Sequence, residues 1–256
     1  MNAFEGPNWQ IIVGDSLDAL LTVADGAARL VFADPPYNLG VDYGNGAKAD
    51  RLPRAEYVAW CRRWIAACAA KLTPDGSLWV LINHENAAHV YLALEEAGLH
   101  WRDTITWYET FGVNCTRKFN RTSRPLFHFA RHPRRFVFHA GAVRRSSDRL
   151  AIYNDKRANP AGKTWDDVWE IPRLAGTHKE RLAGFPTQLP LALLRPVIGC
   201  ASDSGDLVLD PFAGSGTAGV AALETGRRFL GIEKEARFAE RAATRLRQVA
   251  RPGALA

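Results

Sequence analysis

A glycine-rich turn in the last quarter of this 256-residue chain constrains its fold more than any other feature. The apolar run Asp206–Asp210 predicts a buried strand, Pro211–Thr217 supplies the turn, and residues 215–225 have a helical pattern. Free N–H groups at such a helix start, and glycines without Cβ atoms, let a ligand approach the backbone closely. The next strand, 228–233, ends in Glu233, whose carboxylate can accept both hydroxyl groups of a ribose. The turn therefore predicts a site for a nucleoside-containing cofactor.

The position of this turn indicates the strand order. Only about 40 residues follow it, so the other strands of a nucleotide-binding sheet must come from the N-terminal half. Apolar runs predict those strands at Trp9–Val13, Leu30–Ala33 and Ser77–Ile82, and helical patterns alternate with them. Helices are expected at 55–71, 87–97, 186–201 and 235–250. The alternation favours an α/β fold with a circularly permuted, mostly parallel sheet and helices on both faces.

The tetrapeptide Asp34-Pro35-Pro36-Tyr37 follows the second predicted strand. Two prolines cannot continue a central strand, so the chain must turn at the strand's carboxyl end, where parallel sheets bind ligands. The Asp34 carboxylate and the Pro35 carbonyl then form two adjacent acceptors, which match the two hydrogens of an exocyclic amine. Tyr37 offers an aromatic face on which an extruded base can stack. The pattern predicts an amine-activating site, with a strand-ending turn around a buried tyrosine as the alternative.

A basic region separates the two motifs. Between Asn114 and Arg157, only Asp148 and Asp155 oppose twelve basic residues. These are Arg117, Lys118, Arg121, Arg124, Arg131, Arg134, Arg135, Arg144, Arg145, Arg149, Lys156 and Arg157. A segregation of this kind indicates a polyanion partner, although a solvated basic face would look the same. Short strands are expected at 126–130 and 135–139, and Asn38–Pro53 has the composition of a mobile loop.

Five motifs in this order resemble those of the amino-group DNA methyltransferases of the β arrangement. They are Gly14–Leu17, Asp34–Asn38, Phe185–Pro190, Asp210–Thr217 and Gly231–Glu233. The resemblance implies a Rossmann-like methyltransferase fold with a seven-stranded sheet and S-adenosylmethionine as cofactor. It also divides the chain into a catalytic half, 1–109, an inserted target-recognition region, 110–180, and a cofactor half, 181–256.

The resemblance also implies the site residues. The catalytic residues would be Asp34, Pro35, Pro36 and Tyr37. Residues expected to line the cofactor pocket are Asp15, Asp34, Thr187, Gln188, Asp210, Phe212, Ala213, Gly214, Ser215, Gly216, Thr217 and Glu233. Glu233 would hold the ribose, Asp15 the adenine amine, and Thr187 and Gln188 the methionine end. The basic region, and not the resemblance, supplies the residues expected to bind nucleic acid, which are Arg117, Lys118, Arg121, Arg124, Arg144 and Arg145.

An aspartate at position 34 points to N6 of adenine as the methylated atom, because enzymes that act on N4 of cytosine usually carry serine there. Cytosine stays an alternative. An oxidoreductase with a nicotinamide cofactor and a catalytically silent DNA-binding regulator are two further alternatives. Double-stranded DNA is the expected partner, and a homodimer and a cognate restriction endonuclease are possible partners.

The remaining features point to no further chemistry. The four cysteines and seven histidines have neither the spacing of a metal site nor that of a disulfide framework, so no metal is expected. No apolar run reaches the length of a membrane span and no signal peptide is visible, so we expect a cytoplasmic protein without a membrane partner.

Overall fold

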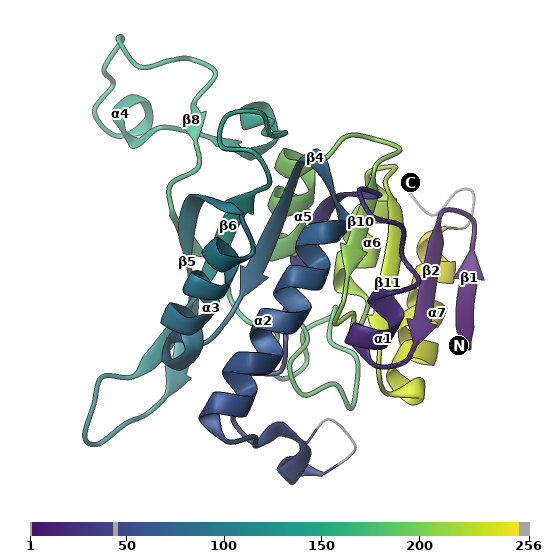
Figure 1. The fold of residues 1–256 in the computed structure, drawn as a ribbon. Coiled ribbons are helices and arrows are strands. Elements are labelled where there is room, and N and C mark those ends of the chain that lie inside the picture. The colour runs from purple at the N-terminus through teal and green to yellow at the C-terminus, as the bar shows by residue number, and fades with distance from the viewer. Residues whose placement is uncertain (1, 43–45, 251–256) are drawn as a thin grey trace.

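The computed structural model describes residues 2–42 and 46–250, which are built around a twisted central sheet (Figure 1). Its strand order is β1-β2-β11-β10-β3-β4-β6-β5-β9. Bounds in the N-terminal half are β1 Ala3–Gly6, β2 Trp9–Val13, β3 Ala28–Ala33, β4 Leu72–Leu81, β5 His100–Val113 and β6 Arg121–Ala130. The later strands are β9 Val168–Glu170, β10 Leu207–Asp210 and β11 Arg228–Glu233. The expected seven-stranded sheet runs from β2 to β5, and β1 and β9 extend it at its two edges.

The sheet is permuted as predicted. Strand β10 lies between β11 and β3 and is parallel to both, with Leu209 paired to Leu230 on one side and to Val31 on the other. Strand β11 is also parallel to β2, and β3 is parallel to β4. Strand β6 is antiparallel to both β4 and β5. The loops after β3 and β10, far apart in the sequence, therefore emerge side by side from the carboxyl edge of the parallel strands.

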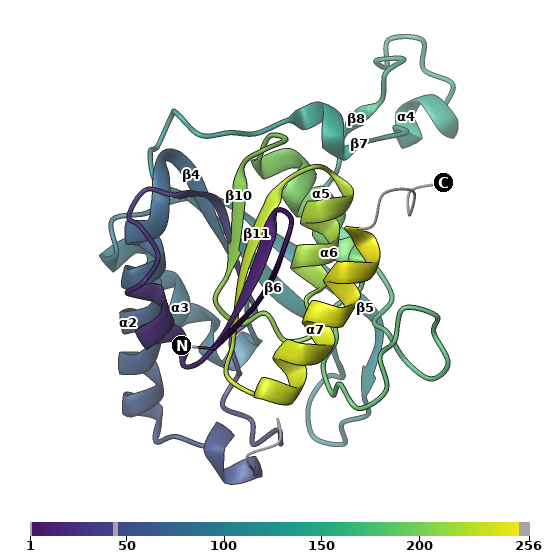
Figure 2. The same cartoon turned by 90° about the vertical axis from the view of Figure 1, so that its right-hand side faces the viewer.

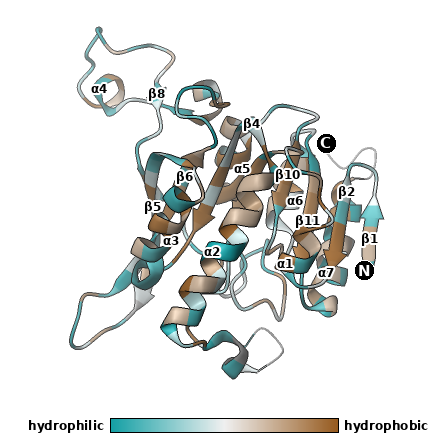
Figure 3. Cartoon of the chain, in the orientation of Figure 1, coloured by the Kyte–Doolittle hydropathy of each residue, from teal (hydrophilic) through white to brown (hydrophobic). Residues whose placement is uncertain are grey.

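Helices cover both faces of the sheet (Figure 2). The helices α1 (Ser16–Leu20), α2 (Arg54–Lys71) and α3 (His84–Glu96) pack on one face. The other face is covered by α5 (Leu191–Ala201), α6 (Thr217–Glu224) and α7 (Ala236–Val249). Figure 3 shows that the strands in the middle of the sheet are apolar.

Alternation along the central strands divides the core into two layers. Leu30 and Phe32 belong to the cluster beneath α5–α7, whereas Val31 and Ala33 belong to the cluster beneath α1–α3. All four side chains are at most 1% exposed. Residues on both sides of the strand are thus buried, as expected for a parallel strand between two helical layers.

Proline residues explain where α5 begins. The predicted helix 186–201 starts only at Leu191, because Pro190 is its N-cap, with an extended backbone (φ −74°, ψ 144°). A proline also disfavours helical geometry at the residue before it, so 186–189 remain a loop. That loop lies beside the carboxyl edge.

Part of the region predicted as an insertion belongs to the central sheet. Strand β6 lies within 110–180 but is an integral strand of the sheet, paired on both sides. Two segments project instead. The first is the β5–β6 hairpin at the carboxyl edge, whose turn, residues 114–120, we call the hairpin tip. The second is residues 131–167 at the amino edge, which we call the amino-edge lobe; the two lie at opposite ends of the sheet in Figure 1. Short elements of the lobe are η2 (Ala140–Val143), β7 (Arg144–Arg145), α4 (Asp148–Ala151) and β8 (Lys163–Thr164).

The strand predicted at 135–139 is wrong. Instead of joining a ladder, Val137 N–H donates to the Asp75 carbonyl (3.1 Å) and His139 N–H donates to the Cys200 carbonyl (2.8 Å). The alternation that suggested a strand places Phe136 and Phe138 against the ring of buried His128. The alternation of this segment therefore reflects the packing of its two phenylalanines on the sheet, although the segment itself is not a strand.

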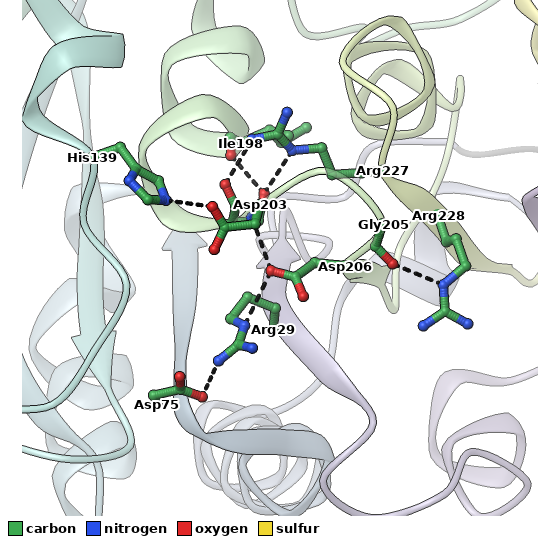
Figure 4. A network of polar contacts seen from close by, with 10 residues as sticks. Arg29, Asp75, His139, Ile198, Asp203, Gly205, Asp206, Arg227 and Arg228 are labelled. Carbon is green, nitrogen blue, oxygen red and sulfur yellow. Dashed lines mark hydrogen bonds and ion pairs between the residues drawn. The ribbon is translucent and has the colours of Figure 1, made fainter.

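A polar network closes the amino edge and ties the lobe to it (Figure 4). The Arg29 guanidinium, on β3, contacts the carboxylates of Asp75, in the first part of β4, and of Asp206, which directly precedes β10. His139 Nε2 lies 2.9 Å from Asp203 Oδ1, so the start of the lobe is fixed beside the end of α5. This edge is opposite the predicted site.

The predicted loop 38–53 contains one short helix, η1 (Ala47–Asp50), in its described part. The Asp50 carboxylate accepts backbone N–H groups from Asn38 and from 39–41, at 2.9–3.1 Å. This side chain organises the chain immediately after the Asp34–Tyr37 turn. Residues 43–45 of the predicted loop lie outside the described residues.

Candidate active site

The Asp34–Tyr37 turn leaves β3 at the carboxyl edge, and neighbouring helices fix it there. The Tyr57 hydroxyl, on α2, donates to the Pro36 carbonyl at 2.8 Å. The Asn86 amide, on α3, donates to the Tyr37 carbonyl at 3.0 Å. Two helices of one face therefore set the position of the turn.

Four side chains form a connected polar group at this turn. The Tyr37 hydroxyl donates a short hydrogen bond to Asp34 Oδ1. Arg124, from β6, places Nη1 3.4 Å from the same hydroxyl and Nε 2.6 Å from Glu109 Oε1, on β5. The Arg124 guanidinium also lies over the Tyr37 ring, 5.3 Å from its centroid. Arg124, which the sequence predicts to bind nucleic acid, therefore lies inside the site, beside the Asp34–Tyr37 turn.

Burial shapes the ionisation of this group. It raises the pKa of Asp34 to about 6, while the positive charge of Arg124 and the hydrogen bond from Tyr37 oppose the rise. Burial and the Asp34 charge raise the pKa of Tyr37 well above its usual value, so its hydroxyl remains a donor. Asp34 is therefore ionised at neutral pH in an environment that binds hydrogen-bond donors strongly.

The glycine turn after β10 lies beside the Asp34 turn. Gly214 and Gly216 have positive φ angles, of 49° and 72°, and Gly216 is the N-cap of α6. The Glu233 carboxylate accepts the N–H groups of Gly214 (2.9 Å) and Glu235 (2.8 Å). Asp210 accepts the Phe212 N–H at 2.9 Å. Two carboxylates are thus held on either side of the turn.

One cavity of about 430 Å³ joins the two turns. Of the predicted site residues, its lining includes Asp15, Asp34, Pro35, Pro36, Tyr37, Thr187, Gln188, Asp210, Phe212, Ala213, Gly214, Ser215, Thr217, Glu233 and Arg124. Gly216 does not line it; its backbone instead shapes the turn beneath. The permuted sheet thus brings both predicted half-sites, about 175 residues apart in sequence, to a single cavity.

The carboxylates that line this cavity fit a ligand that carries both a positive charge and the hydroxyl groups of a nucleoside. Burial, with the nearby charges of Asp34 and Glu233, raises the pKa of Asp210 to about 8. Burial also raises the pKa of Glu233. Several carboxylates crowded into one cavity disfavour each other's ionisation, and a positively charged ligand with hydroxyl groups relieves that cost. At Gly214 an added Cβ would meet only the Phe212 carbonyl, at 3.8 Å, so the turn leaves space towards a ligand.

Three of the predicted cofactor residues have roles that the sequence did not indicate. The Gln188 amide accepts from Leu182 N–H (2.7 Å) and donates to the Glu180 carbonyl (2.6 Å), so it closes its own loop. The Thr217 hydroxyl accepts from Arg245 Nη1 at 2.9 Å. Asp15 caps α1 through the Leu17 N–H, at 3.0 Å.

Aromatic residues of α2 were missed as part of the site. Tyr57 and Trp60 line the cavity, and the Trp60 and Trp64 rings lie 5.6 and 5.3 Å from that of Phe212. The sequence indicated only core packing for the two tryptophans. Their spacing with Tyr57 along one helix stripe was the available signal. Lys234 was also missed; its Nζ lies 3.3 Å from Asp15 Oδ2 at the cavity.

Apart from Arg124, which lines the cavity, the residues predicted to bind nucleic acid separate into two groups. Arg117, Lys118 and Arg121 lie at the β5–β6 hairpin, at the same edge as the cavity, and Arg121 pairs with Glu85. Arg144 and Arg145 lie in the amino-edge lobe. There Arg144 donates to the Gly162 carbonyl and Arg145 pairs with Asp166. The structure therefore does not bring these two arginines to the cavity.

Among residues 2–42 and 46–250, no helix is both long and apolar enough to cross a membrane.

Comparison with known proteins is consistent with this geometry. A family model described as DNA methylase matches residues 28–244. The Type II methyltransferase M.HpaI of Haemophilus parainfluenzae is 32% identical over 239 residues, covering 93% of this chain and 74% of that protein. The DNA adenine methyltransferase YhdJ of Escherichia coli (strain K12) is 31% identical over 246 residues, covering 92% and 82%.

Solved structures show the same fold. The M1.HpyAVI–SAM complex superposes with a TM-score of 0.68 at 22% identity, covering 93% of this chain and 98% of that one. The cytosine-N4-specific PvuII DNA methyltransferase superposes with a TM-score of 0.71 at 19% identity, covering 93% and 86%. The family match spans both half-sites of the cavity, and the chain belongs to the DNA methylase family, whose methyl donor is S-adenosylmethionine.

Proposed function

We propose that this enzyme acts in the cytoplasm and transfers a methyl group from S-adenosylmethionine to N6 of an adenine extruded from double-stranded DNA. The observation that carries the proposal is the junction of the Asp34–Tyr37 turn and the Gly214 turn in one cavity. The name of the relative YhdJ, an adenine methyltransferase, supports adenine as the base. The resemblance is compatible with a homodimer and with a cognate restriction endonuclease, and it does not imply the endonuclease.

The cofactor half of the cavity would hold S-adenosylmethionine through its carboxylates. Glu233 would accept the ribose hydroxyls, and Asp15 the adenine amine. When bound, the cofactor supplies an electrophilic methyl carbon on a positively charged sulfur. Because the methyl carbon is already electrophilic, this transfer requires neither a metal ion nor a covalent nucleophile from the protein.

The catalytic half positions the target amine. Asp34 and the Pro35 carbonyl would each accept one amine hydrogen, which directs the nitrogen lone pair away from the base ring and towards the cofactor half. Transfer of the methyl group would break its bond to the sulfur, which would keep the electron pair, and would leave a positive charge on the amine nitrogen. That nitrogen would then lose a proton, which an ionised Asp34 can accept. The Tyr37 ring, with Arg124 over one face, offers its remaining face to the base.

Substitution of Asp34 tests this assignment. We expect Asp34→Ala to retain S-adenosylmethionine binding in calorimetry and to lose at least about 100-fold in methyl transfer to duplex DNA, since a positioned acceptor contributes about that much. Asp18→Asn, which removes an exposed carboxylate of α1 outside the cavity, is the matched control and should retain activity. Turnover by Asp34→Ala close to that of wild type would contradict the role of Asp34.

Nucleoside analysis decides the methylated base. DNA from a methylation-free host that expresses the wild-type chain should contain N6-methyladenine. N4-methylcytosine in its place would overturn the choice of adenine. Unmodified DNA, together with binding of NAD but not of S-adenosylmethionine, would favour an oxidoreductase.

A further inference from the structure

The hairpin tip, residues 114–120, exposes an aromatic side chain almost completely. Phe119 is 97% exposed, more than any other large hydrophobic residue among those described. The tip is nevertheless an ordered turn: Asn120 Oδ1 accepts the Cys115 N–H at 2.8 Å, and Asn120 Nδ2 donates to Asn114 Oδ1 at 3.2 Å. The structure therefore presents an uncovered phenylalanine on a shaped support.

The charge around Phe119 indicates what could cover it. Arg117 and Lys118 precede it directly, both are exposed, and neither has an ion pair within residues 2–42 and 46–250. No acidic residue occurs between Gly112 and Arg124. An aromatic ring beside unpaired cations matches a DNA duplex, which offers phosphates on its outside and stacked bases within.

The strand register places the tip next to the active site. Arg124 of β6 lines the cavity and pairs with Trp107. Arg121 directly follows the hairpin tip and pairs with Val113. Arg124 lies three residue steps along the strand from Arg121, a span of roughly 10 Å. A duplex whose extruded base reaches Tyr37 thus lies within reach of the tip.

We propose that the hairpin tip is a wedge that enters the DNA duplex, with Phe119 stacking in the gap left by the extruded adenine and Arg117 and Lys118 holding flanking phosphates. The inference rests on the proposed function. Extrusion costs the stacking and pairing energy of the target base, and an aromatic ring in the vacated place restores part of the stacking. The tip thereby acts on the extrusion step, whereas Asp34 acts on methyl transfer.

Phe119→Ala tests the wedge on two versions of one duplex. The first contains the methylation site fully paired, and the second places an abasic site opposite the target adenine, so that the adenine is already unpaired. We expect Phe119→Ala to lose about fivefold or more in kcat/KM on the paired duplex, since stacking of one base on an aromatic ring is worth at least that much. On the second duplex it should act within about twofold of wild type, because extrusion there costs little.

Further variants separate the wedge from loss of folding or of general DNA contact. Phe119→Trp keeps an aromatic ring and should retain activity on the paired duplex. Leu92→Ala truncates another exposed apolar residue, on the outer side of α3, and should behave as wild type on both duplexes. With 2-aminopurine as the target base, fluorescence should rise on binding to wild type and rise less with Phe119→Ala.

Three results would overturn the inference. Wild-type activity of Phe119→Ala on the paired duplex would show that the ring is dispensable. An equal loss on both duplexes would show that it contributes affinity or folding instead of extrusion. No methylation of DNA by the wild-type chain would overturn the proposed function, and the wedge with it, whereas the first two results leave the proposed function intact.

Discussion

Arg124 is one of twelve basic residues between 114 and 157, and nothing in the neighbouring sequence distinguishes it from the others. Its position in the structure depends on two long-range pairings. The register of β6 against β5 sets Arg124 near Glu109, and the order of the strands sets both near the turn after β3. Asp34 and Glu233 could be predicted because local motifs carry them. Arg124 could not, because its role arises only from contacts between distant strands.

Removal of Arg124 should shift the pH dependence of methyl transfer. Its charge lowers the pKa of Asp34 against the effect of burial, so Arg124→Gln should raise that pKa above about 6. Because ionised Asp34 is the active form, activity is present above its pKa and is lost as the pH falls through it. The acidic limb of the kcat/KM profile should therefore move to higher pH in the variant.

Glu109→Gln serves as the comparison for this shift. Glu109 is 5% exposed and its charge raises the pKa of Asp34, so its removal should move the acidic limb to lower pH, provided that Arg124 keeps its position. A pH profile of Arg124→Lys that matches wild type, beside a shifted profile of Arg124→Gln, would support a role through charge. A profile that stays unchanged in Arg124→Gln would contradict the electrostatic role.

At the scale of elements, the sequence predicts best where the chain has a local reason to start or stop. Trp9–Val13 and Arg228–Glu233 have the bounds expected from apolar runs. The start of α5 was misplaced because prolines 186 and 190 were included in the helical pattern. The prediction of a strand at 135–139 was wrong. Alternation of apolar and polar residues shows which face of a segment is buried, but not whether another strand pairs with it.

Close packing of α6 on the sheet leads to a prediction for Gly219. A Cβ at this position would lie 2.6 Å from Phe229 Cδ1, on β11. Gly219→Ala should therefore destabilise the protein by about 1–3 kcal/mol through overpacking, despite the better helical propensity of alanine. The midpoint of urea unfolding measures the change.

Gly199→Ala in α5 is a matched control, since its Cβ would lie 3.4 Å from that of Ala142, an ordinary contact. This variant should be as stable as wild type or slightly more stable. Equal effects of the two substitutions would mean that the spacing between α6 and β11 does not limit stability.

At the scale of the whole molecule, the basic stretch seen in the sequence is divided between opposite ends of the sheet. The hairpin tip lies at the carboxyl edge with the cavity, and the amino-edge lobe lies at the other end (Figure 1). In the lobe, Arg149 and Arg157 both pair with Asp155. Net charge along the sequence could not reveal this division, because it depends on the direction in which β6 crosses the sheet.

The division predicts which charges govern DNA affinity. The double variant Arg117→Gln/Lys118→Gln should reduce the salt dependence of DNA binding, lowering the slope of log K against log salt by about 2. Arg134→Gln/Lys156→Gln removes the same charges from the lobe and should leave the slope unchanged. Binding isotherms at several salt concentrations measure both. The reverse result would make the lobe the DNA-binding surface.

The place of β10 between β11 and β3 also has a consequence for how the chain is made. Strands β2 and β3 leave the ribosome before β10 and β11 but do not touch each other in the sheet, because β11 and β10 lie between them. Until residues 207–233 have been synthesised, the edges of β2 and β3 that face each other are unpaired, and the cavity lacks the residues that follow β10 and β11. Permutation therefore delays closure of the sheet, and with it the first moment at which the enzyme can modify DNA, until β10 and β11 have left the ribosome.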